Sequence, residues 1–260
     1  MDLPKGFYER TSKYLRDMNI DVSDKVVLVG GVGTLGSRIV RDLARFNFKK
    51  IIVVDVDFVG PENVGYQCYH SEEIGKKKVE AIAKRFSKYH PWTTVEPHFL
   101  EVYTLSGLVT LNELKKYDEL VASSDAVVST FDSAGARATS LLLAFRRGKV
   151  FVDAGLGVTR GYVKLLKEGY CPICERVWED QVRYYTNPNL AEVVAAFATQ
   201  AVLYALSGKA WPAEVTVNLD APFNPVSVSE IRNEGCPLCS EEAREIGLEE
   251  IPKFLMEKIY

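Results

Sequence analysis

Apolar residues along this chain follow two patterns that alternate and predict strands and helices in turn. Short apolar runs, typical of buried strands, occupy 25–30, 49–57, 125–131 and 149–156, and a more polar strand is predicted over 93–102. Between these runs, apolar residues spaced three and four apart predict helices over 34–47, 75–89, 111–122 and 133–147. Strands that alternate with helices indicate a parallel sheet with right-handed crossovers. Pro97 lies in the third strand, which we therefore expect near a sheet edge or a break.

The pattern changes after Gly157. A helix predicted over 190–207 is apolar on most sides, which indicates a buried helix. Short alternating strands over 213–220 and 225–232 predict an antiparallel extension, and a short helix ends the sequence. We therefore expect an α/β fold with a Rossmann-like, doubly wound, mostly parallel sheet. Residues 1–157 would form its core with an N-terminal helical arm, and 158–260 would complete the same single domain.

Composition narrows the possible partners. Hydrophobic residues make up 47% of the 260 residues, enough for a sizeable core. The formal net charge of -3 and the lack of a polybasic run argue against nucleic-acid or membrane-surface partners. The first residues are charged and lack a signal-like apolar stretch, and no apolar run reaches the ~20 residues that cross a bilayer. We expect a soluble, cytoplasmic protein.

A glycine-rich turn, "VGGVGTLGSRI", joins the first strand to the first helix. Gly31, Gly33 and Gly36 fit a phosphate-binding turn, in which they permit the tight turn, the close approach of phosphate and the packing of helix on strand. Asp55 ends the second strand, at the spacing of an acid that binds ribose hydroxyls. Any tight strand–helix turn can be rich in glycine, but this context favours nucleotide binding. The turn alone favours a dinucleotide and does not separate NAD from ATP.

Four of the five cysteines form two C-x-x-C pairs: Cys171 with Cys174, and Cys236 with Cys239. Such pairs in an intracellular chain indicate metal ligands. Four thiolates make a closed tetrahedral set, suited to structural zinc rather than to catalysis. The alternative is two disulfides or free thiols.

The residues from Asp55 onward resemble the ThiF/MoeB/HesA family of adenylating enzymes, relatives of ubiquitin-activating enzyme. The family pattern runs D-x-D-x-V, N-x-x-R-Q and G-x-x-K-V. The matching residues here are Asp55, Asp57, Val59, Asn63, Gln67, Gly75, Lys78 and Val79. The resemblance continues in "STFDSAGAR", with Asp132 and Arg137, in an N-terminal "YER" that places Arg10, and in the two cysteine pairs. It covers nearly the whole chain.

The resemblance implies an enzyme that activates a carboxylate with ATP and Mg²⁺ and releases pyrophosphate. Asp132, Lys78 and Arg10 would be catalytic, with Arg10 reaching across a homodimer interface. The resemblance also implies one structural Zn²⁺ on the four cysteines. The expected ATP-binding residues are Gly31, Gly33, Gly36, Asp55, Asp57, Asn63, Gln67 and Lys78.

Each assignment has a plainer alternative. Lys78 could be a solvated lysine of the run "KKK", Asp132 a helix N-cap, and Arg10 a surface residue of a mobile N-terminus. The chain could also be a non-catalytic nucleotide-binding scaffold or an NAD-dependent protein, although its three histidines lie in no recognisable motif.

The chain departs from the family pattern at two places. The arginine of N-x-x-R-Q is Tyr66 here, so a charged phosphate contact becomes a neutral phenol. Lys76 or Lys77 could take the place of the missing arginine. Thr34 stands at a family glycine, where its hydroxyl could add a contact.

The region before the buried helix, "YYTNPNLAEVV", lacks the cysteine that thioester-forming members carry. Cys68 is the only cysteine outside the pairs, and we expect it to pack rather than react. We therefore expect adenylation without an enzyme thioester. The substrate would be a ubiquitin-like or sulfur-carrier C-terminus, or a small cofactor precursor such as the pyridinol carboxylate of iron-hydrogenase cofactor synthesis.

Overall fold

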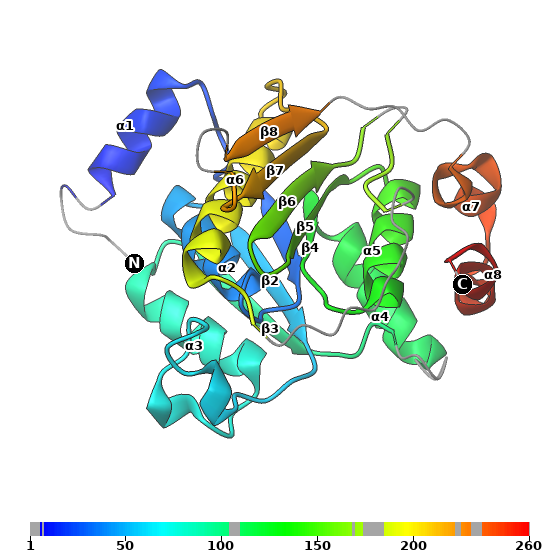
Figure 1. Cartoon of the computed structure of the whole chain (residues 1–260), viewed down its shortest axis with the longest axis horizontal. Helices are drawn as coiled ribbons and strands as arrows, with labels where there is room; N and C mark the ends of the chain where they lie inside the picture. Colours follow the sequence, from blue (N-terminus) through cyan, green and yellow to red (C-terminus); the bar gives the residue numbers. More distant parts are fainter. Residues whose placement is uncertain are drawn as a thin grey trace.

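The computed structural model of the chain contains one eight-stranded sheet at its centre (Figure 1). The structure describes residues 6, 8–103, 110–167, 170–173, 185–221, 225–229 and 236–259. The strand order is β3-β2-β1-β4-β5-β6-β7-β8. The strands are β1 (Val26–Gly30), β2 (Lys50–Asp55), β3 (Thr94–Phe99), β4 (Ala126–Ser129), β5 (Val150–Leu156), β6 (Arg160–Leu165), β7 (Glu214–Asn218) and β8 (Val226–Ser229).

The sheet has a parallel half and an antiparallel half. β3, β2, β1, β4 and β5 pair in parallel, whereas β6, β7 and β8 continue the sheet from β5 as antiparallel strands. This arrangement confirms the mixed α/β sheet with an antiparallel extension. β3 is an edge strand, so Pro97, which has no N–H to donate, is tolerated there.

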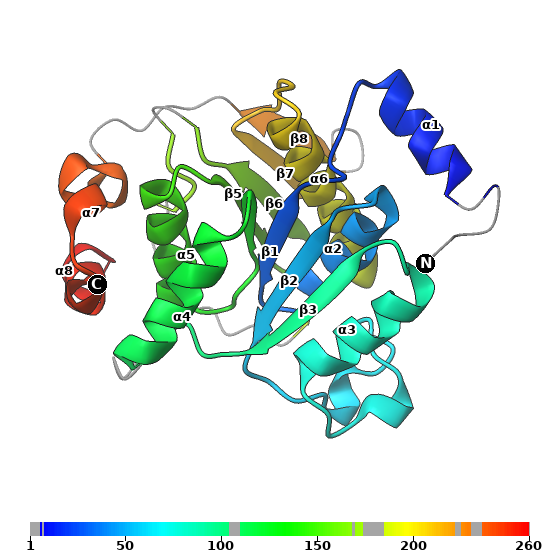
Figure 2. The ribbon, with the colours of Figure 1, turned by 180° about the vertical axis from the view of Figure 1, so that it is seen from behind.

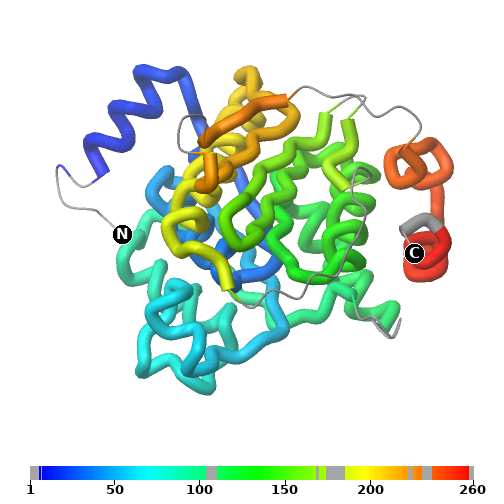
Figure 3. Tube along the Cα trace, in the orientation of Figure 1, coloured from blue at the N-terminus to red at the C-terminus, as the bar shows by residue number. Residues whose placement is uncertain are grey.

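Helices cover both faces of the sheet (Figures 1 and 2). The α-helices are α1 (Glu9–Asp17), α2 (Gly36–Leu43), α3 (Lys78–Tyr89), α4 (Leu111–Ala122), α5 (Ala134–Arg146), α6 (Pro188–Leu206), α7 (Glu241–Glu245) and α8 (Ile251–Ile259). Short 3₁₀ turns are η1 (Ala44–Phe46), η2 (Pro61–Asn63), η3 (Ser71–Glu73), η4 (Pro237–Cys239) and η5 (Leu248–Glu250). α2, α3 and α6 share one core layer with the sheet, and α4, α5 and α8 share the other. In Figure 3 the orange and red trace of α7 and α8 lies on the outer side of α5, which both contact.

The two core layers follow from the alternation of side chains along each strand. In β1, Val27 and Val29 face the layer of α2 and α6, while Leu28 faces the layer of α4 and α5. All three side chains are fully buried. Because β1, β2, β4 and β5 are covered on both faces, their sequences are nearly continuously apolar, whereas the edge strand β3 alternates between buried and more exposed residues.

α6 is apolar because it is a core helix. Within the described ranges it alone has the length and apolar composition to cross a membrane. Here it packs on β5, β6 and α2, and residues such as Leu190, Val194 and Ala198 are fully buried.

The observed starts of α3 and α5 change the expected positions of two candidate site residues. α3 begins at Lys78 rather than at 75, since Gly75 has a φ of +82° and Lys77 is not helical. Lys78 is therefore the first residue of its helix and does not lie one turn inside it. α5 begins at Ala134, and its N-cap is Ser133, whose hydroxyl accepts a hydrogen bond from the Ala136 N–H.

Candidate functional site

A cavity of about 380 Å³ lies at the carboxyl ends of the parallel strands. Ligands of doubly wound sheets bind at this edge, where the strand order reverses direction, here between β1 and β4. The lining residues are Gly31, Gly33, Thr34, Leu35, Asp55, Val56, Asp57, Gln67, Lys78, Leu100, Glu101, Val102, Tyr103, Thr130, Phe131, Asp132, Ser133, Ala136, Arg137, Ala154, Gly155 and Leu156.

The surroundings of the three glycines explain why the turn needs glycine at two of them and leaves space at the third. Gly31 has a φ of +80°, and a Cβ there would come within 3.1 Å of the Thr130 main chain. A Cβ on Gly36 would lie 1.9 Å from the Gly31 carbonyl oxygen, so glycine is needed where α2 meets the turn. A Cβ on Gly33 would meet nothing closer than the Gln67 side-chain nitrogen at 3.9 Å. The backbone at Gly33 is thus bare toward the cavity.

Asp55, the last residue of β2, is hydrogen-bonded to the glycine turn. Its two carboxylate oxygens accept hydrogen bonds from the Val32 N–H (2.7 Å) and the Asp57 N–H (2.8 Å). Burial raises the pKa of Asp55, and these two N–H donors and the Lys78 ammonium oppose the rise. The carboxylate therefore fixes the turn while it lines the cavity.

Lys78 is a buried cation on the cavity wall. It is only 6% exposed, and its Nζ lies 2.8 Å from Asp57 Oδ2. The alternative of a solvated lysine is therefore wrong. Lys76 donates to the Glu72 carbonyl, and Lys77 lies over the Phe99 ring. Neither of these neighbours is among the cavity-lining residues of the described structure.

Asp132 follows β4 and presents an exposed side chain on the cavity wall. The N-cap alternative is wrong, because Ser133 is the N-cap of α5. A carboxylate on the lining of this cavity has the chemistry of a Mg²⁺ ligand.

The segment 63–67 contributes one residue to the cavity and one to its support. Gln67 lines the cavity, and its Oε1 is buried without a hydrogen-bond partner in the described structure. Such an orphaned acceptor fits a ligand that brings a hydroxyl or amino donor. Asn63 does not line the cavity, and its side-chain oxygen instead accepts a hydrogen bond from the Gly60 N–H in the η2 turn.

Arg10 lies far from the cavity of its own chain. It is exposed on α1, which leads into the start of β1 and so lies at the amino edge of the sheet. Of the described residues that line the cavity, none comes from α1. The structure thus brings together Gly31, Gly33, Asp55, Asp57, Gln67, Lys78 and Asp132, and it leaves Arg10, Asn63 and Gly36 outside the lining.

A buried ion pair at the end of β5 was not assigned a role from the sequence. Arg137 of α5 is paired with the fully buried Asp153, and donates to the Ala154 carbonyl (3.0 Å) and the Tyr162 hydroxyl (3.1 Å). Burial alone would lower the pKa of Arg137, but the Asp153 carboxylate outweighs it and raises the pKa. An aspartate inside the apolar run "VFVDAGL" was the signal for this pair.

The cysteine pairs converge as expected for metal ligands. The sulfur atoms of Cys171, Cys236 and Cys239 all lie within 4.8 Å of one another. Three sulfur atoms so placed suit a tetrahedral thiolate site, but Cys236 is disulfide-bonded in this structure and would have to be reduced before it could bind a metal. The fourth expected ligand, Cys174, lies outside the described residues.

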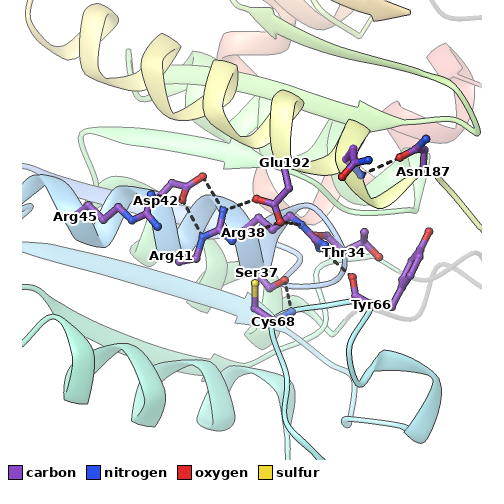
Figure 4. Close-up of polar contacts among 11 residues, drawn as sticks. Thr34, Ser37, Arg38, Arg41, Asp42, Arg45, Tyr66, Cys68, Asn187 and Glu192 are labelled. Atoms are coloured by element: carbon purple, nitrogen blue, oxygen red, sulfur yellow. Dashed lines mark hydrogen bonds and ion pairs between the residues drawn. The ribbon is translucent and has the colours of Figure 1, made fainter. Parts of the chain in front are cut away.

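Tyr66 and Cys68 flank Gln67 in the sequence, and both are labelled in Figure 4. The Tyr66 hydroxyl donates to the Thr186 carbonyl at 2.5 Å. Cys68 is half-buried, and its main-chain N–H donates to the Ser37 hydroxyl. Neither residue is among the described cavity-lining residues.

These features define an α/β protein with a Rossmann-like sheet and a glycine-lined cavity at its carboxyl edge. The chain belongs to the ThiF family, which its sequence matches over residues 15–238.

Individual relatives of the chain share less than a third of its aligned residues. The chain is 25% identical over 286 residues to the ubiquitin-like modifier-activating enzyme ATG7 of Saccharomyces cerevisiae, covering 95% of this chain and 45% of that protein. It is 29% identical over 174 residues to the NEDD8-activating enzyme E1 catalytic subunit of Arabidopsis thaliana, covering 62% of this chain and 36% of that protein. It thus spans less than half the length of these relatives. The E. coli MccB structure with AMPCPP and MccA has the same fold, with a TM-score of 0.74, 17% identity, and coverage of 92% of this chain and 75% of that chain.

Proposed function

We propose that the protein is an ATP-dependent adenylyltransferase that activates a carboxylate as an acyl-adenylate. The observation that carries this proposal is the convergence of Gly33, Asp55, Lys78, Gln67 and Asp132 on one cavity at the carboxyl edge of the sheet. These residues come from five separate segments of the chain.

The residues that line the cavity have groups suited to the ribose and to the phosphates of ATP. Asp55 lies at the end of β2, where a carboxylate accepts hydrogen bonds from ribose hydroxyls. The bare backbone at Gly33 and the N-terminus of α2 suit the phosphates, because free N–H groups and the helix dipole attract anions. The ion-pair partner of Lys78 in the described part of the chain is Asp57, whose side chain is 62% exposed, so the Lys78 ammonium could bind a phosphate oxygen instead.

The reaction that fits these groups forms one bond and breaks another. A carboxylate oxygen of the substrate attacks the α-phosphorus, the bond from that phosphorus to the bridging oxygen breaks, and pyrophosphate leaves. Lys78 stabilises negative charge on the phosphate oxygens during this exchange. Asp132 is placed to hold Mg²⁺, and a bound magnesium ion would neutralise charge on the triphosphate.

The relatives favour this chemistry and suggest the kind of substrate. The names of the two curated relatives state that they activate ubiquitin-like modifiers or NEDD8, and the MccB structure was solved with AMPCPP and MccA. We infer a carboxylate substrate, either the C-terminus of a ubiquitin-like or sulfur-carrier protein or a small cofactor precursor. Cys68 is not among the described residues that line the cavity, which supports a reaction that ends at the acyl-adenylate.

Further parts of the proposal concern the assembly. Cys171, Cys236 and Cys239, with Cys174, would bind one structural Zn²⁺. The protein would be a cytoplasmic homodimer in which Arg10 of one subunit completes the cavity of the other. Residues 1–157 and 158–260 would fold as one domain, since β5 and β6 are neighbours in one sheet.

Calorimetry tests the nucleotide directly. We expect ATP to bind in the presence of Mg²⁺, with weaker binding when EDTA removes the metal and none of comparable strength for NAD. Tight NAD binding without ATP binding would reject the proposal.

Pyrophosphate exchange with a panel of carboxylates, including a sulfur-carrier protein, then identifies the substrate. A protein that binds ATP but catalyses exchange with no carboxylate would support the alternative of a non-catalytic scaffold.

A further inference from the structure

A buried arginine that the sequence analysis did not single out lies behind the glycine turn (Figure 4). Arg38 of α2 is only 5% exposed. One of its guanidinium nitrogens, Nη1, donates to the Thr34 carbonyl (2.7 Å) and to the Tyr66 carbonyl (3.0 Å). Its Nε donates to Glu192 Oε1 of α6 at 2.7 Å. A single side chain thus joins three segments.

Two of these segments contribute residues to the cavity lining. Thr34 belongs to the glycine turn and lines the cavity. Tyr66 directly precedes Gln67, which lines the cavity beside Gly33 and carries the orphaned Oε1. Arg38 therefore fixes the separation of the turn and Gln67 without lining the cavity itself.

The side chain of Tyr66 is hydrogen-bonded to the main chain of Thr186. Its hydroxyl donates to the Thr186 carbonyl and accepts from the Thr186 N–H, both at 2.5 Å. Thr186 in turn donates through its hydroxyl to the Gly157 carbonyl. The phenol therefore anchors the chain before α6 and does not replace a phosphate-binding arginine. A guanidinium does reach residue 66, but it comes from Arg38 and binds the main chain.

We propose that Arg38 is a positioning residue for nucleotide binding, which holds the glycine turn and Gln67 in the spacing that ATP requires. The inference rests on the proposed function. Arginine suits this role because its planar guanidinium donates in several directions at once, which a lysine ammonium on a flexible stem does not reproduce. Without it, the two carbonyls lose their donor, and ATP has to order both walls on binding.

The test compares two arginines that share one partner. Arg41 also pairs with Glu192, at 2.6 Å, but is bonded to neither Thr34 nor Tyr66. We expect Arg38→Gln to raise the Kd for MgATP by about tenfold, as for the loss of ~1.4 kcal/mol of binding free energy. The matched control Arg41→Gln should leave the Kd within about twofold of wild type.

Two further variants separate positioning from general destabilisation. Arg38→Lys keeps a cation for Glu192, so it should fold like wild type while still weakening MgATP binding by about threefold or more, since one ammonium cannot bond all three acceptors. Tyr66→Phe removes the contacts to Thr186 and leaves the Tyr66 carbonyl in place, so its MgATP affinity should equal that of wild type. Amide exchange in the nucleotide-free Arg38 variants should accelerate at residues 66–68 and not in β1 or β4.

The outcomes are distinct. If wild type itself fails to bind MgATP, the proposed function fails and this inference fails with it. If wild type binds and both Arg38 variants bind equally well, only the role of Arg38 is overturned. Equal losses in Arg41→Gln or Tyr66→Phe would overturn it too, because general destabilisation or the phenol would then explain the effect. Should Arg38→Gln not fold, Arg38→Lys decides the question.

Discussion

At the scale of single residues, the charged side chains around the cavity have two distinct environments. Asp55, Lys78 and Arg137 are each less than 9% exposed and are hydrogen-bonded to the turn or to a partner carboxylate. Asp132 is exposed on the cavity wall. Buried, paired charges hold a site in shape, whereas an exposed carboxylate is free to bind an incoming cation.

Replacing Asp132 therefore tests the proposed chemistry. We expect Asp132→Ala to lower carboxylate-dependent pyrophosphate exchange a hundredfold or more, since loss of one preorganised electrostatic contact costs ~3–4 kcal/mol in the transition state. Cys68→Ala should keep most of the activity, because Cys68 does not line the cavity. Normal exchange by the Asp132 variant would remove its assignment as a metal ligand. A folded but inactive Cys68 variant would instead make that thiol an acceptor.

Two glycines of the same turn should respond differently to alanine. In Gly36→Ala the new methyl group would lie 1.9 Å from the Gly31 carbonyl oxygen, so we expect a loss of ~1–3 kcal/mol of unfolding free energy. In Gly33→Ala the methyl group has room, so stability should stay near wild type while MgATP affinity falls. Chemical denaturation and calorimetry measure the two effects. Equal loss of stability in both variants would contradict this account of the turn.

At the scale of elements, α2 and α6 are joined by a cluster of ion pairs in addition to their apolar contact. Glu192 of α6 binds Arg38 and Arg41 of α2, and Arg41 and Arg45 also contact Asp42 (Figure 4). Burial alone would raise the pKa of Glu192, but hydrogen bonds from Arg41 and Arg38 outweigh it and lower the pKa. The cluster therefore depends on an ionised Glu192.

A pH series checks this dependence. Because the folded pKa of Glu192 is lowered, its ionisation adds stability above the unfolded pKa of about 4.3 and loses it as pH falls through the folded value. Wild type should therefore exceed Glu192→Gln in unfolding free energy at pH 7 and pH 5, with the difference shrinking below about pH 4. The Glu192 side chain is 44% exposed, so the difference is reduced by solvent and salt. A difference that stays constant down to pH 3 would contradict the ion-pair explanation.

At the scale of the whole molecule, the C-terminal helices depend on few contacts with the sheet domain. α7 and α8 pack on α5 rather than on the sheet, and the cysteine cluster joins Cys171, close after β6, to Cys236 and Cys239 at their start. A metal there would tie two segments far apart in the chain.

Metal analysis should therefore return about one zinc per chain, the stoichiometry of a four-thiolate site. Removal with a strong chelator should lower the melting temperature, and Cys239→Ser should reproduce that loss without a chelator. Cys68→Ser serves as the control and should keep its zinc. A metal-free preparation with unchanged melting temperature would reject the site.

Subunit complementation tests the role of Arg10. In a homodimer that uses Arg10 in trans, mixing inactive Arg10→Ala and Asp132→Ala chains forms heterodimers with one intact site. Random mixing of such two-fold dimers should restore about a quarter of wild-type pyrophosphate exchange. Light scattering should show a dimer of the 29.1 kDa chain. A monomer, or no recovery on mixing, would leave Arg10 as a surface residue.

The sequence alone determined the main elements and several of the polar residues that line the cavity. The helix predicted over 111–122 has those bounds in α4, and the central strands lie within the predicted runs. Gly31, Gly33 and Asp55 were found from the local spacing of the glycine turn, and Lys78 and Asp132 from the family resemblance. All five line one cavity because strands that end at one sheet edge bring the residues that follow them together.

Only the tertiary structure decided which residues touch. Arg38 and Glu192 are 154 positions apart, and Tyr66 and Thr186 are 120 apart, so no local pattern predicts either contact. The same applies to Asn63, which supports a turn instead of lining the cavity, and to Ser133, which caps α5 and leaves Asp132 exposed. Hydrogen bonds are short-ranged and directional, so a partner is set by the packing of whole elements and not by the residue type that the sequence shows.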